Sequence, residues 1–212
     1  MDPGELRARV ETSRLYLVTD GRGGGAGLAD FLDAVLSAGV DVIQLREKEL
    51  EARQILSLAE VFRDRCDAYG VPFIVNDRAD VALAARADGV HLGQDDLPVA
   101  GARRVLGRNA IIGRSTHDSD QFRDAMVEEV DYVVAGPVHE TPTKPGRPAA
   151  GIDLIRLAAA EATKPWFAIG GIDLTTIGDV RAAGASRVVV VRAITASEDP
   201  GASVKLLREA LE

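Results

Sequence analysis

The sequence predicts a parallel α/β protein, and most simply a single (β/α)8 TIM barrel. Short apolar runs alternate with amphipathic helical patterns along the chain. About eight such pairs fit into 212 residues, which suits a compact barrel. Polar clusters follow the apolar runs, which is where barrel enzymes carry their sites. Periodicity does not show whether the sheet closes, so an open doubly wound sheet is the alternative.

Each predicted strand is an apolar run without alternation, as expected of a parallel strand covered on both faces. In chain order these runs occupy residues 15–19, 42–45, 72–75, 89–92, 110–113, 132–135, 166–169 and 188–191. The first two helices run from Leu28 to Gly39 and from Ile55 to Gly70, since glycine favours the left-handed conformation that ends a helix. The other helices are predicted near residues 81–86, 99–106, 122–126, 152–160, 175–183 and 204–211.

The composition is that of a soluble globular protein, with 46% hydrophobic and 27% charged residues. No linker divides the chain, so we expect residues 1–212 to form one domain, with 1–13 as an N-terminal extension. No apolar run approaches the roughly 20 residues of a membrane-spanning helix, and the first residues lack a signal-peptide pattern. The net charge of -8 argues against nucleic-acid binding. The oligomeric state stays open, with a homo-oligomer among the alternatives.

The only cysteine, Cys66, cannot form an intramolecular disulfide, which is consistent with a cytoplasmic location. It falls within a helical pattern, and we expect a buried structural thiol rather than a nucleophile.

Two carboxylates, Asp77 and Asp96, each follow a predicted strand that also carries basic or amide side chains. Carboxylates at converging strand ends suit Mg²⁺, which takes a few protein oxygens and shares the rest with phosphates. Asp95 and Asp96 are neighbours, and only one of them needs to face the metal. The segment 44–48, Q-L-R-E-K, follows another strand and adds two cations. Acids for a metal beside bases for a phosphate indicate chemistry on a diphosphate.

The ends of the last two predicted strands favour a phosphate site. Gly170 and Gly171 follow the seventh strand, and glycine permits close approach of an anion to backbone N–H groups. Loops seven and eight of such barrels often bind phosphate. The long segment 136–146 offers two threonine hydroxyls and a lysine for the same purpose. A solvated proline-rich connection is the alternative for this segment.

Other motifs carry less information. The Gly-rich segment 21–27 matches neither a P-loop nor a dinucleotide fingerprint, so a flexible loop is expected. His91 lies within an apolar strand and is expected to be a hydrogen-bonded core histidine. His117 follows the fifth strand, where contact with a ligand and an orienting role are both open. The histidine spacing does not indicate a zinc site.

Seven motifs occur in order between residues 44 and 172: Q-L-R-E-K, V-N-D-R-A-D, A-D-G-V-H-L-G-Q-D-D-L-P, I-G-R-S-T-H, D-Y-V-V-A-G-P, T-P-T-K and A-I-G-G-I. With them, residues 15–194 resemble the thiamine-phosphate synthase (thiamine-phosphate pyrophosphorylase) family. The resemblance implies a transferase that joins 4-amino-2-methyl-5-(diphosphooxymethyl)pyrimidine to a thiazole ethyl phosphate, carboxylated or not. Thiamine phosphate and pyrophosphate are the implied products. It also implies departure of the diphosphate to leave a pyrimidine methylene cation, which the thiazole nitrogen captures.

The resemblance also implies roles for individual residues. Those for the pyrimidine diphosphate are Gln44, Leu45, Arg46, Glu47, Lys48, Asn76, Ser115 and Lys144. Those for the thiazole phosphate are Thr141, Pro142, Thr143, Gly171, Val191 and Arg192. The implied catalytic residues are Arg46, Lys48, Ser115 and Lys144. Asp77 and Asp96 would hold one Mg²⁺ per subunit on the diphosphate. Many family members have serine at the position of Arg192, where a main-chain contact would tolerate the change.

Three other functions are alternatives. A thiazole tautomerase relative shares the fold but needs neither both carboxylates nor the Q-L-R-E-K set, and this chain keeps all of them. A different phosphate-binding isomerase barrel is the second alternative. The third is a non-catalytic protein that binds thiamine precursors, in which we would expect the metal-binding acids or Lys144 to be lost.

Overall fold

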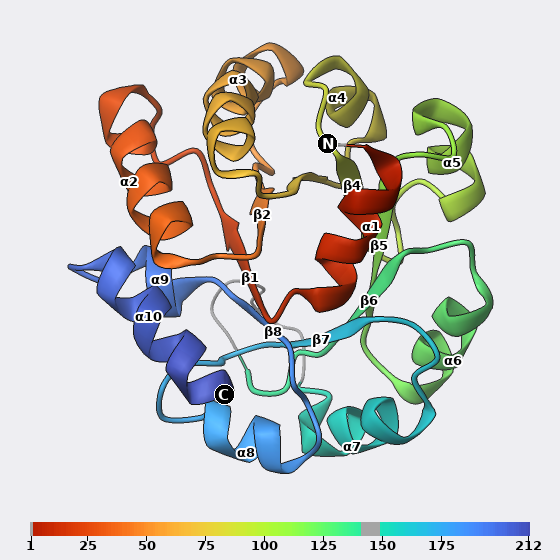
Figure 1. Cartoon of the computed structure of the whole chain (residues 1–212). Helices are drawn as coiled ribbons and strands as arrows, with labels where there is room; N and C mark the ends of the chain where they lie inside the picture. Colours follow the sequence, from red (N-terminus) through yellow and green to blue (C-terminus); the bar gives the residue numbers. More distant parts are fainter. Residues whose placement is uncertain (1, 141–148) are drawn as a thin grey trace.

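Eight parallel strands form a closed barrel in sequence order, as the computed structural model of residues 2–140 and 149–212 shows (Figure 1). The strands are β1 (Leu15–Thr19), β2 (Val42–Leu45), β3 (Phe73–Asn76), β4 (Gly89–Leu92), β5 (Ile111–Thr116), β6 (Tyr132–Ala135), β7 (Trp166–Ile169) and β8 (Val188–Val190). Parallel pairing of β1 with β8 closes the sheet. The predicted (β/α)8 barrel is therefore confirmed, and the open sheet is wrong.

Helices surround this barrel, as the outer ring of Figure 1 shows. They are α2 (Gly25–Ala38), α3 (Ala52–Tyr69), α4 (Ala79–Ala84), α5 (Val99–Leu106), α6 (Ser119–Val127), α7 (Gly151–Glu161), α8 (Ile177–Ala182) and α10 (Pro200–Leu211). None of the helices in the described residues is both long and apolar enough to cross a membrane. The thiol of Cys66 is buried on α3, and burial raises its pKa, so the expected structural thiol is confirmed.

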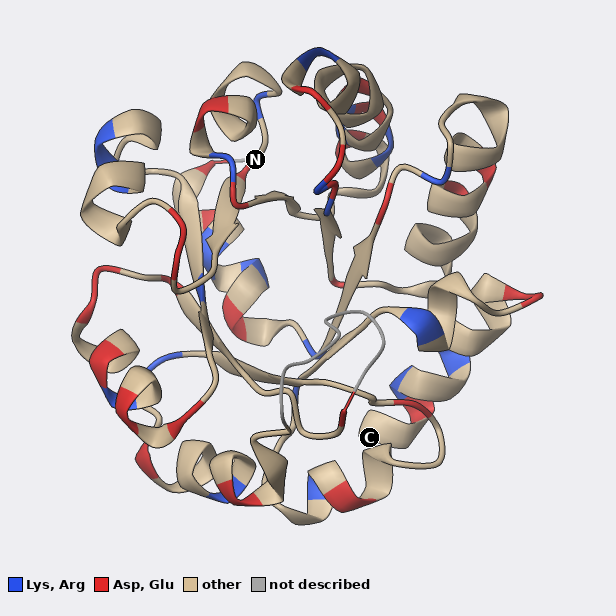
Figure 2. Cartoon of the chain, turned by 180° about the vertical axis from the view of Figure 1, so that it is seen from behind, with Lys and Arg blue, Asp and Glu red and all other residues tan. Residues whose placement is uncertain are grey.

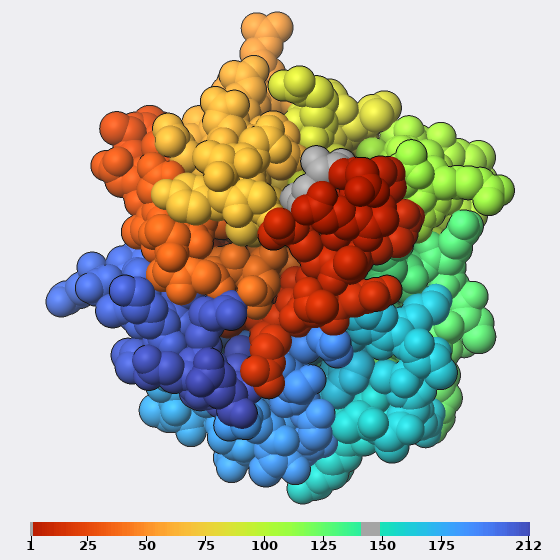
Figure 3. Space-filling view, viewed as in Figure 1, coloured from red at the N-terminus to blue at the C-terminus, as the bar shows by residue number. Residues whose placement is uncertain are grey.

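Two helices were not predicted from the sequence, α1 (Pro3–Thr12) and α9 (Arg192–Thr195). Helix α1 lies across the end of the barrel at which the strands begin, in the centre of Figures 1 and 3. Its buried residues Leu6 and Val10 pack against apolar side chains inside the barrel. The expected extension is thus a helical cap whose apolar face is only two residues wide, too little for a clear periodic signal.

Three aspartates occupy equivalent positions, each one residue before an even-numbered strand: Asp41, Asp88 and Asp131. Their carboxylates accept hydrogen bonds from backbone N–H groups at the start of the preceding strand. The donors are Leu15, Phe73 and Ile112, at 2.9, 2.8 and 2.8 Å. Each carboxylate also pairs with an arginine: Arg208, Arg63 and Arg103, at 2.8, 2.9 and 3.1 Å. These contacts tie neighbouring strands together at the end covered by α1.

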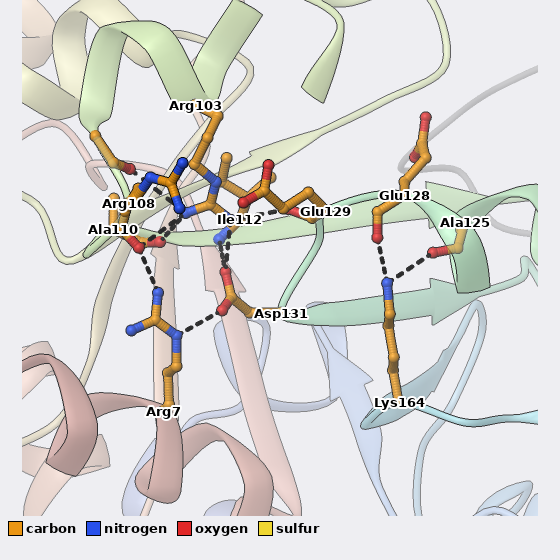
Figure 4. Close-up of polar contacts among 11 residues, drawn as sticks. Arg7, Arg103, Arg108, Ala110, Ile112, Ala125, Glu128, Glu129, Asp131 and Lys164 are labelled. Carbon is orange, nitrogen blue, oxygen red and sulfur yellow. Dashed lines mark hydrogen bonds and ion pairs between the residues drawn. The ribbon is translucent and has the colours of Figure 1, made fainter. Parts of the chain in front are cut away.

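Asp131 also fixes α1 to the barrel (Figure 4). The Nε of Arg7 on α1 donates to Oδ1 of Asp131 at 2.9 Å, and its Nη2 donates to the carbonyl oxygen of Arg108 at 2.6 Å. Lys164, also drawn in Figure 4, donates to the carbonyl oxygen of Glu128 just before β6, and burial lowers the pKa of its amine. At the equivalent position before β8, Arg187 donates to the carbonyl oxygens of Glu11 and Ser13.

We expect Asp131→Ala to destabilise the protein by about 3 kcal/mol, because it leaves the guanidinium of Arg103 buried without its carboxylate. The side chains of this pair are only 10% and 13% exposed. Urea unfolding followed by circular dichroism measures the loss. Asp153→Ala is the matched control, since it breaks a pair whose carboxylate is 89% exposed and should cost less than about 0.5 kcal/mol. Equal effects of the two variants would contradict a specific role for Asp131.

Candidate active site

Two adjacent cavities lie at the end of the barrel where the strands finish, the end that Figure 2 shows from the front. The larger has a volume of about 420 Å³ and is lined by Tyr16, Gln44, Arg46, Lys48, Asn76, Asp77, His91, Asp96 and Ser115, among others. The smaller, of about 280 Å³, is lined by His117, Gly136, Gly170, Gly171, Val191 and Arg192, among others. Ser115 and Val191 line both. Described members of the two residue sets that the sequence assigned to different ligands therefore lie side by side.

Not every predicted residue reaches these cavities. Leu45 is buried in the core between the strands and the outer helices, and Glu47 accepts a hydrogen bond from the backbone N–H of Gly21 at 2.6 Å. Neither lines the larger cavity. The predicted residues Thr141, Pro142, Thr143 and Lys144 lie outside the described residues.

Asp77 follows β3 in a conformation that few residues other than glycine adopt, with φ of 62°. Its backbone N–H donates to the carbonyl oxygen of His91 on β4 at 2.8 Å, which holds the turn against the neighbouring strand. The carboxylate then faces Nζ of Lys48, at 2.8 Å. An acid from β3 and a base that follows β2 are thus brought into direct contact.

The carboxyl group of Asp96 lies beside that of Asp77. Burial, followed by the hydrogen bond with Asp77, raises the pKa of Asp96. The backbone N–H of Gly93 donates to Oδ2 of Asp96 at 2.6 Å. A Cβ atom at Gly93 would stand 2.9 Å from the same oxygen, so glycine permits this turn. Asp95, by contrast, is exposed.

These residues fit a magnesium ion. Burial and the neighbouring carboxyl group of Asp77 raise the pKa of Asp96, and a divalent cation between the two carboxylates would offset their repulsion. No group of three or more acidic, histidine or cysteine ligands occurs in the described part of the chain. Mg²⁺ does not need one, because one or two carboxylates with phosphate oxygens and water complete its shell.

Asn76 adds a second indication of a ligand. Its Nδ2 atom is buried and has no hydrogen-bond partner among the described residues, yet Asn76 lines the larger cavity. A buried donor without a partner costs about 1–3 kcal/mol, so such atoms are uncommon unless a ligand or water satisfies them. The amide therefore marks a position at which an acceptor on a ligand would bind.

Arg114 on β5 supports the loop that carries Asp96, a role that was not predicted from the sequence. Its Nη1 donates to the carbonyl oxygen of Gly93 at 2.6 Å, and its Nε pairs with Glu128 at 3.3 Å. Gln94 in the same loop donates to the carbonyl oxygen of Ser115 at 2.6 Å. A charged residue in the middle of a buried strand was the available signal, since a charge there needs partners.

The smaller cavity is built on glycines and the start of α9. Gly170 and Gly171 have φ of 113° and 62°, and a Cβ at Gly170 would approach the Cα of Pro137 to 2.5 Å. Val191 precedes the first residue of α9, and Arg192 on that helix is exposed. Only glycine lets the chain pass this closely here, leaving backbone groups at the cavity wall.

Two of the three histidines, His91 and His117, line these cavities and make orienting contacts. His91 lies 2.9 Å from Oγ of Ser115 through Nε2 and 3.2 Å from Oη of Tyr132 through Nδ1, so the expected hydrogen-bonded core histidine is confirmed. Nδ1 of His117 donates to the carbonyl oxygen of Gly136 at 2.6 Å. The Gly-rich segment is shorter as a loop than expected, because α2 already begins at Gly25.

Comparison with known proteins assigns the chain to a family. The family described as thiamine monophosphate synthase matches residues 15–194. The chain belongs to this family. The thiamine-phosphate synthase of Mycolicibacterium smegmatis is 54% identical over 213 residues, with 96% of this chain and 94% of that protein covered. The thiamine-phosphate synthase of Thermobifida fusca is 54% identical over 208 residues, with 97% and 95% covered.

A solved structure agrees with the family. Thiamine phosphate pyrophosphorylase from Pyrococcus furiosus has a TM-score of 0.85 at 30% identity, with 97% of each chain covered. The expected resemblance to the thiamine-phosphate synthase family, and the expectation of an enzyme of this type, are therefore confirmed.

Asp96→Asn should raise the melting temperature of the metal-free protein at neutral pH. Because the folded-state pKa of Asp96 is raised, its stability contribution is full below the ordinary pKa and is lost as pH rises through the folded value. Asparagine cannot ionise, but its amide oxygen can still accept from Gly93. Calorimetry between about pH 3 and 8, with chelator, measures the difference. Asp95→Asn is the control, and a lower melting temperature for Asp96→Asn at neutral pH would contradict this electrostatic account.

Proposed function

We propose that this protein is a thiamine-phosphate synthase that condenses the pyrimidine diphosphate with a thiazole ethyl phosphate, carboxylated or not, in the presence of Mg²⁺. The observation that carries the proposal is the contact of Asp77 with both Lys48 and Asp96 at the wall of one cavity. In a member of this family, acids paired with a lysine at a cavity mouth fit a metal-bound diphosphate. Such a ligand neutralises both the acids and the bases around it.

The reaction needs stabilisation of negative charge on the departing diphosphate. Mg²⁺ held by Asp77 and Asp96 would supply a Lewis acid for the phosphate oxygens. Lys48 and Arg46 line the same cavity and would bind the remaining oxygens as the charge builds up. Asn76 would donate its unpartnered Nδ2 to the same ligand. Lys144 has the same expected role, although it lies outside the described residues.

The second requirement is that the two substrates are held in the correct position relative to each other. The smaller cavity, with Gly171 and the main chain at Val191 and Arg192, would hold the thiazole phosphate. Because Ser115 and Val191 line both cavities, the two substrates would meet at this boundary. A dissociative route then needs no protein nucleophile, since the thiazole nitrogen captures the pyrimidine methylene cation. Holding that nitrogen in line with the methylene carbon supplies the positional part of catalysis.

The alternatives explain fewer of these contacts. A tautomerase transfers a proton within the thiazole and has no diphosphate to place against Lys48 and the two carboxylates. A protein that only binds precursors has no need to bring two repelling carboxyl groups together.

Pyrophosphate release from the two substrates tests the proposal directly. We expect product only with Mg²⁺, and a loss of at least about 100-fold in kcat/KM for Asp96→Ala, because charge stabilisation in such sites is worth about 3 kcal/mol or more. Asp95→Ala is the matched control and should stay within about threefold, as its side chain is exposed. Equal losses in the two variants would refute the choice of Asp96, and no coupled product with metal would refute the synthase.

Arg192→Ser tests how the thiazole phosphate is held. Arg192 is exposed at the start of α9, and a contact through its backbone N–H survives the substitution. We expect KM for the thiazole phosphate to change by less than about threefold in steady-state assays at physiological salt. A larger rise in KM would instead assign the contact to the guanidinium group.

A further inference from the structure

Five polar side chains inside the barrel form one hydrogen-bonded chain. Its members are Gln44, Tyr16, Tyr132, His91 and Ser115, all of them at most 7% exposed. Nε2 of Gln44 lies 2.6 Å from Oη of Tyr16, which lies 2.9 Å from Oη of Tyr132. From there, Nδ1 of His91 lies at 3.2 Å, and its Nε2 lies 2.9 Å from Oγ of Ser115. This hydrogen-bonded chain thus runs across the barrel from Gln44 to Ser115, two residues of the proposed pyrimidine site.

The chemistry of these groups gives the chain one direction. An amide nitrogen such as Nε2 of Gln44 can only donate, so Oη of Tyr16 accepts there. Oη of Tyr16 has a single proton, and Tyr16 is fully buried, so a proton that points elsewhere would have no acceptor among the described residues. Its other hydrogen-bond partner is Oη of Tyr132, which therefore accepts this proton. The proton of Tyr132 then points to Nδ1 of His91. Burial raises the pKa of both phenols, so the two hydroxyl protons are retained.

His91 is then an acceptor at Nδ1 and a donor at Nε2. In this arrangement His91 carries a proton on Nε2 and donates it to Oγ of Ser115. The hydroxyl proton of Ser115 is left for a ligand in the cavity that it lines. At the other end, the amide of Gln44 leaves Oε1 as an acceptor for a ligand, beside the second N–H of Nε2. One end of the chain therefore offers an acceptor, and the other offers a donor.

The backbone makes room for this chain. Gly113 on β5 lies in register between His91 on β4 and Tyr132 on β6. A Cβ atom at Gly113 would stand 2.1 Å from Cζ of Tyr132 and 2.6 Å from Nδ1 of His91. Any larger residue would therefore displace the contact between the phenol and the imidazole. A glycine in a central strand otherwise weakens packing, and here it lets side chains of the two flanking strands touch.

We propose that Tyr16, Tyr132 and His91 are positioning residues, which set the donor and acceptor ends at Ser115 and Gln44 for an aminopyrimidine. Such a ring carries an exocyclic amino donor and ring-nitrogen acceptors, which match an amide oxygen and a hydroxyl proton. The choice of ligand rests on the proposed function, whereas the donor-to-acceptor direction of the hydrogen-bonded chain does not. The hydrogen-bonded chain acts as a unit, because exchanging donor and acceptor in any one hydrogen bond would exchange them in the neighbouring hydrogen bonds too.

The tautomer of His91 tests the direction without any substrate. In ¹⁵N NMR spectra of histidine-labelled protein, wild-type His91 should show an unprotonated Nδ1 and a protonated Nε2. Only three histidines need assignment. Tyr132→Phe removes the donor to Nδ1 and should shift that resonance, whereas Tyr69→Phe, the exposed matched control, should not. A proton on Nδ1 of wild-type His91 would overturn the proposal.

Kinetics test the positioning role. Tyr16→Phe and Tyr132→Phe should each raise KM for the pyrimidine diphosphate by about three- to tenfold with little change in kcat, the size expected for one hydrogen bond. The double variant should lose no more than the worse single variant, because either change breaks the same chain. Independent losses that multiply, or a rise in KM for the thiazole phosphate instead, would overturn it.

The two experiments separate the two proposals. If wild-type protein makes no coupled product, the proposed function fails, and the NMR result still decides the direction of the chain. Thermal unfolding of each variant, compared with Tyr69→Phe, identifies any kinetic loss that comes from unfolding at the assay temperature.

Discussion

Closure of the sheet by β1 and β8 is the constraint on which the site depends. In a closed parallel barrel every strand ends at the same mouth, so residues far apart in sequence converge there. Asp77 follows β3 and Asp96 lies in the loop after β4, and these strands pair in register, with Asn76 opposite His91. The two carboxyl groups meet for that reason. In an antiparallel pair they would lie at opposite ends of the strands.

The two ends of the barrel interior differ in chemistry. At the end covered by α1, apolar side chains fill the interior, with Leu6 and Val10 of the helix packed against them. At the other end the interior turns polar and opens into the two cavities. The mutual repulsion of Asp77 and Asp96 lowers the stability of the fold. At the end covered by α1, well-paired carboxylates such as Asp131 offset this loss. Stability and function are therefore carried by opposite ends of the same strands.

Most of the fold could be predicted from the sequence, because buried parallel strands leave apolar runs that helices separate. Convergence of Asp77 and Asp96 could be predicted from strand order alone. The family resemblance already favours Asp96 over Asp95, but how the turn at Gly93 orients these two adjacent side chains could not be predicted. Likewise Tyr16 and Tyr132 are 116 positions apart and read as apolar strand residues, so their contact is visible only in three dimensions.

The side chain just before each even-numbered strand has the charge that suits the backbone groups it contacts. Before β2, β4 and β6 the neighbouring strand presents backbone N–H groups, and an aspartate accepts from them, as Asp88 does from Phe73. Before β8 the neighbouring segment is the end of α1 and the residue after it, which present carbonyl oxygens of Glu11 and Ser13. The guanidinium of Arg187 donates to these oxygens at 3.1 Å for Ser13 and 2.7 Å for Glu11. Arg187 therefore links the end of α1 to the start of β8, whereas the three aspartates link neighbouring strands.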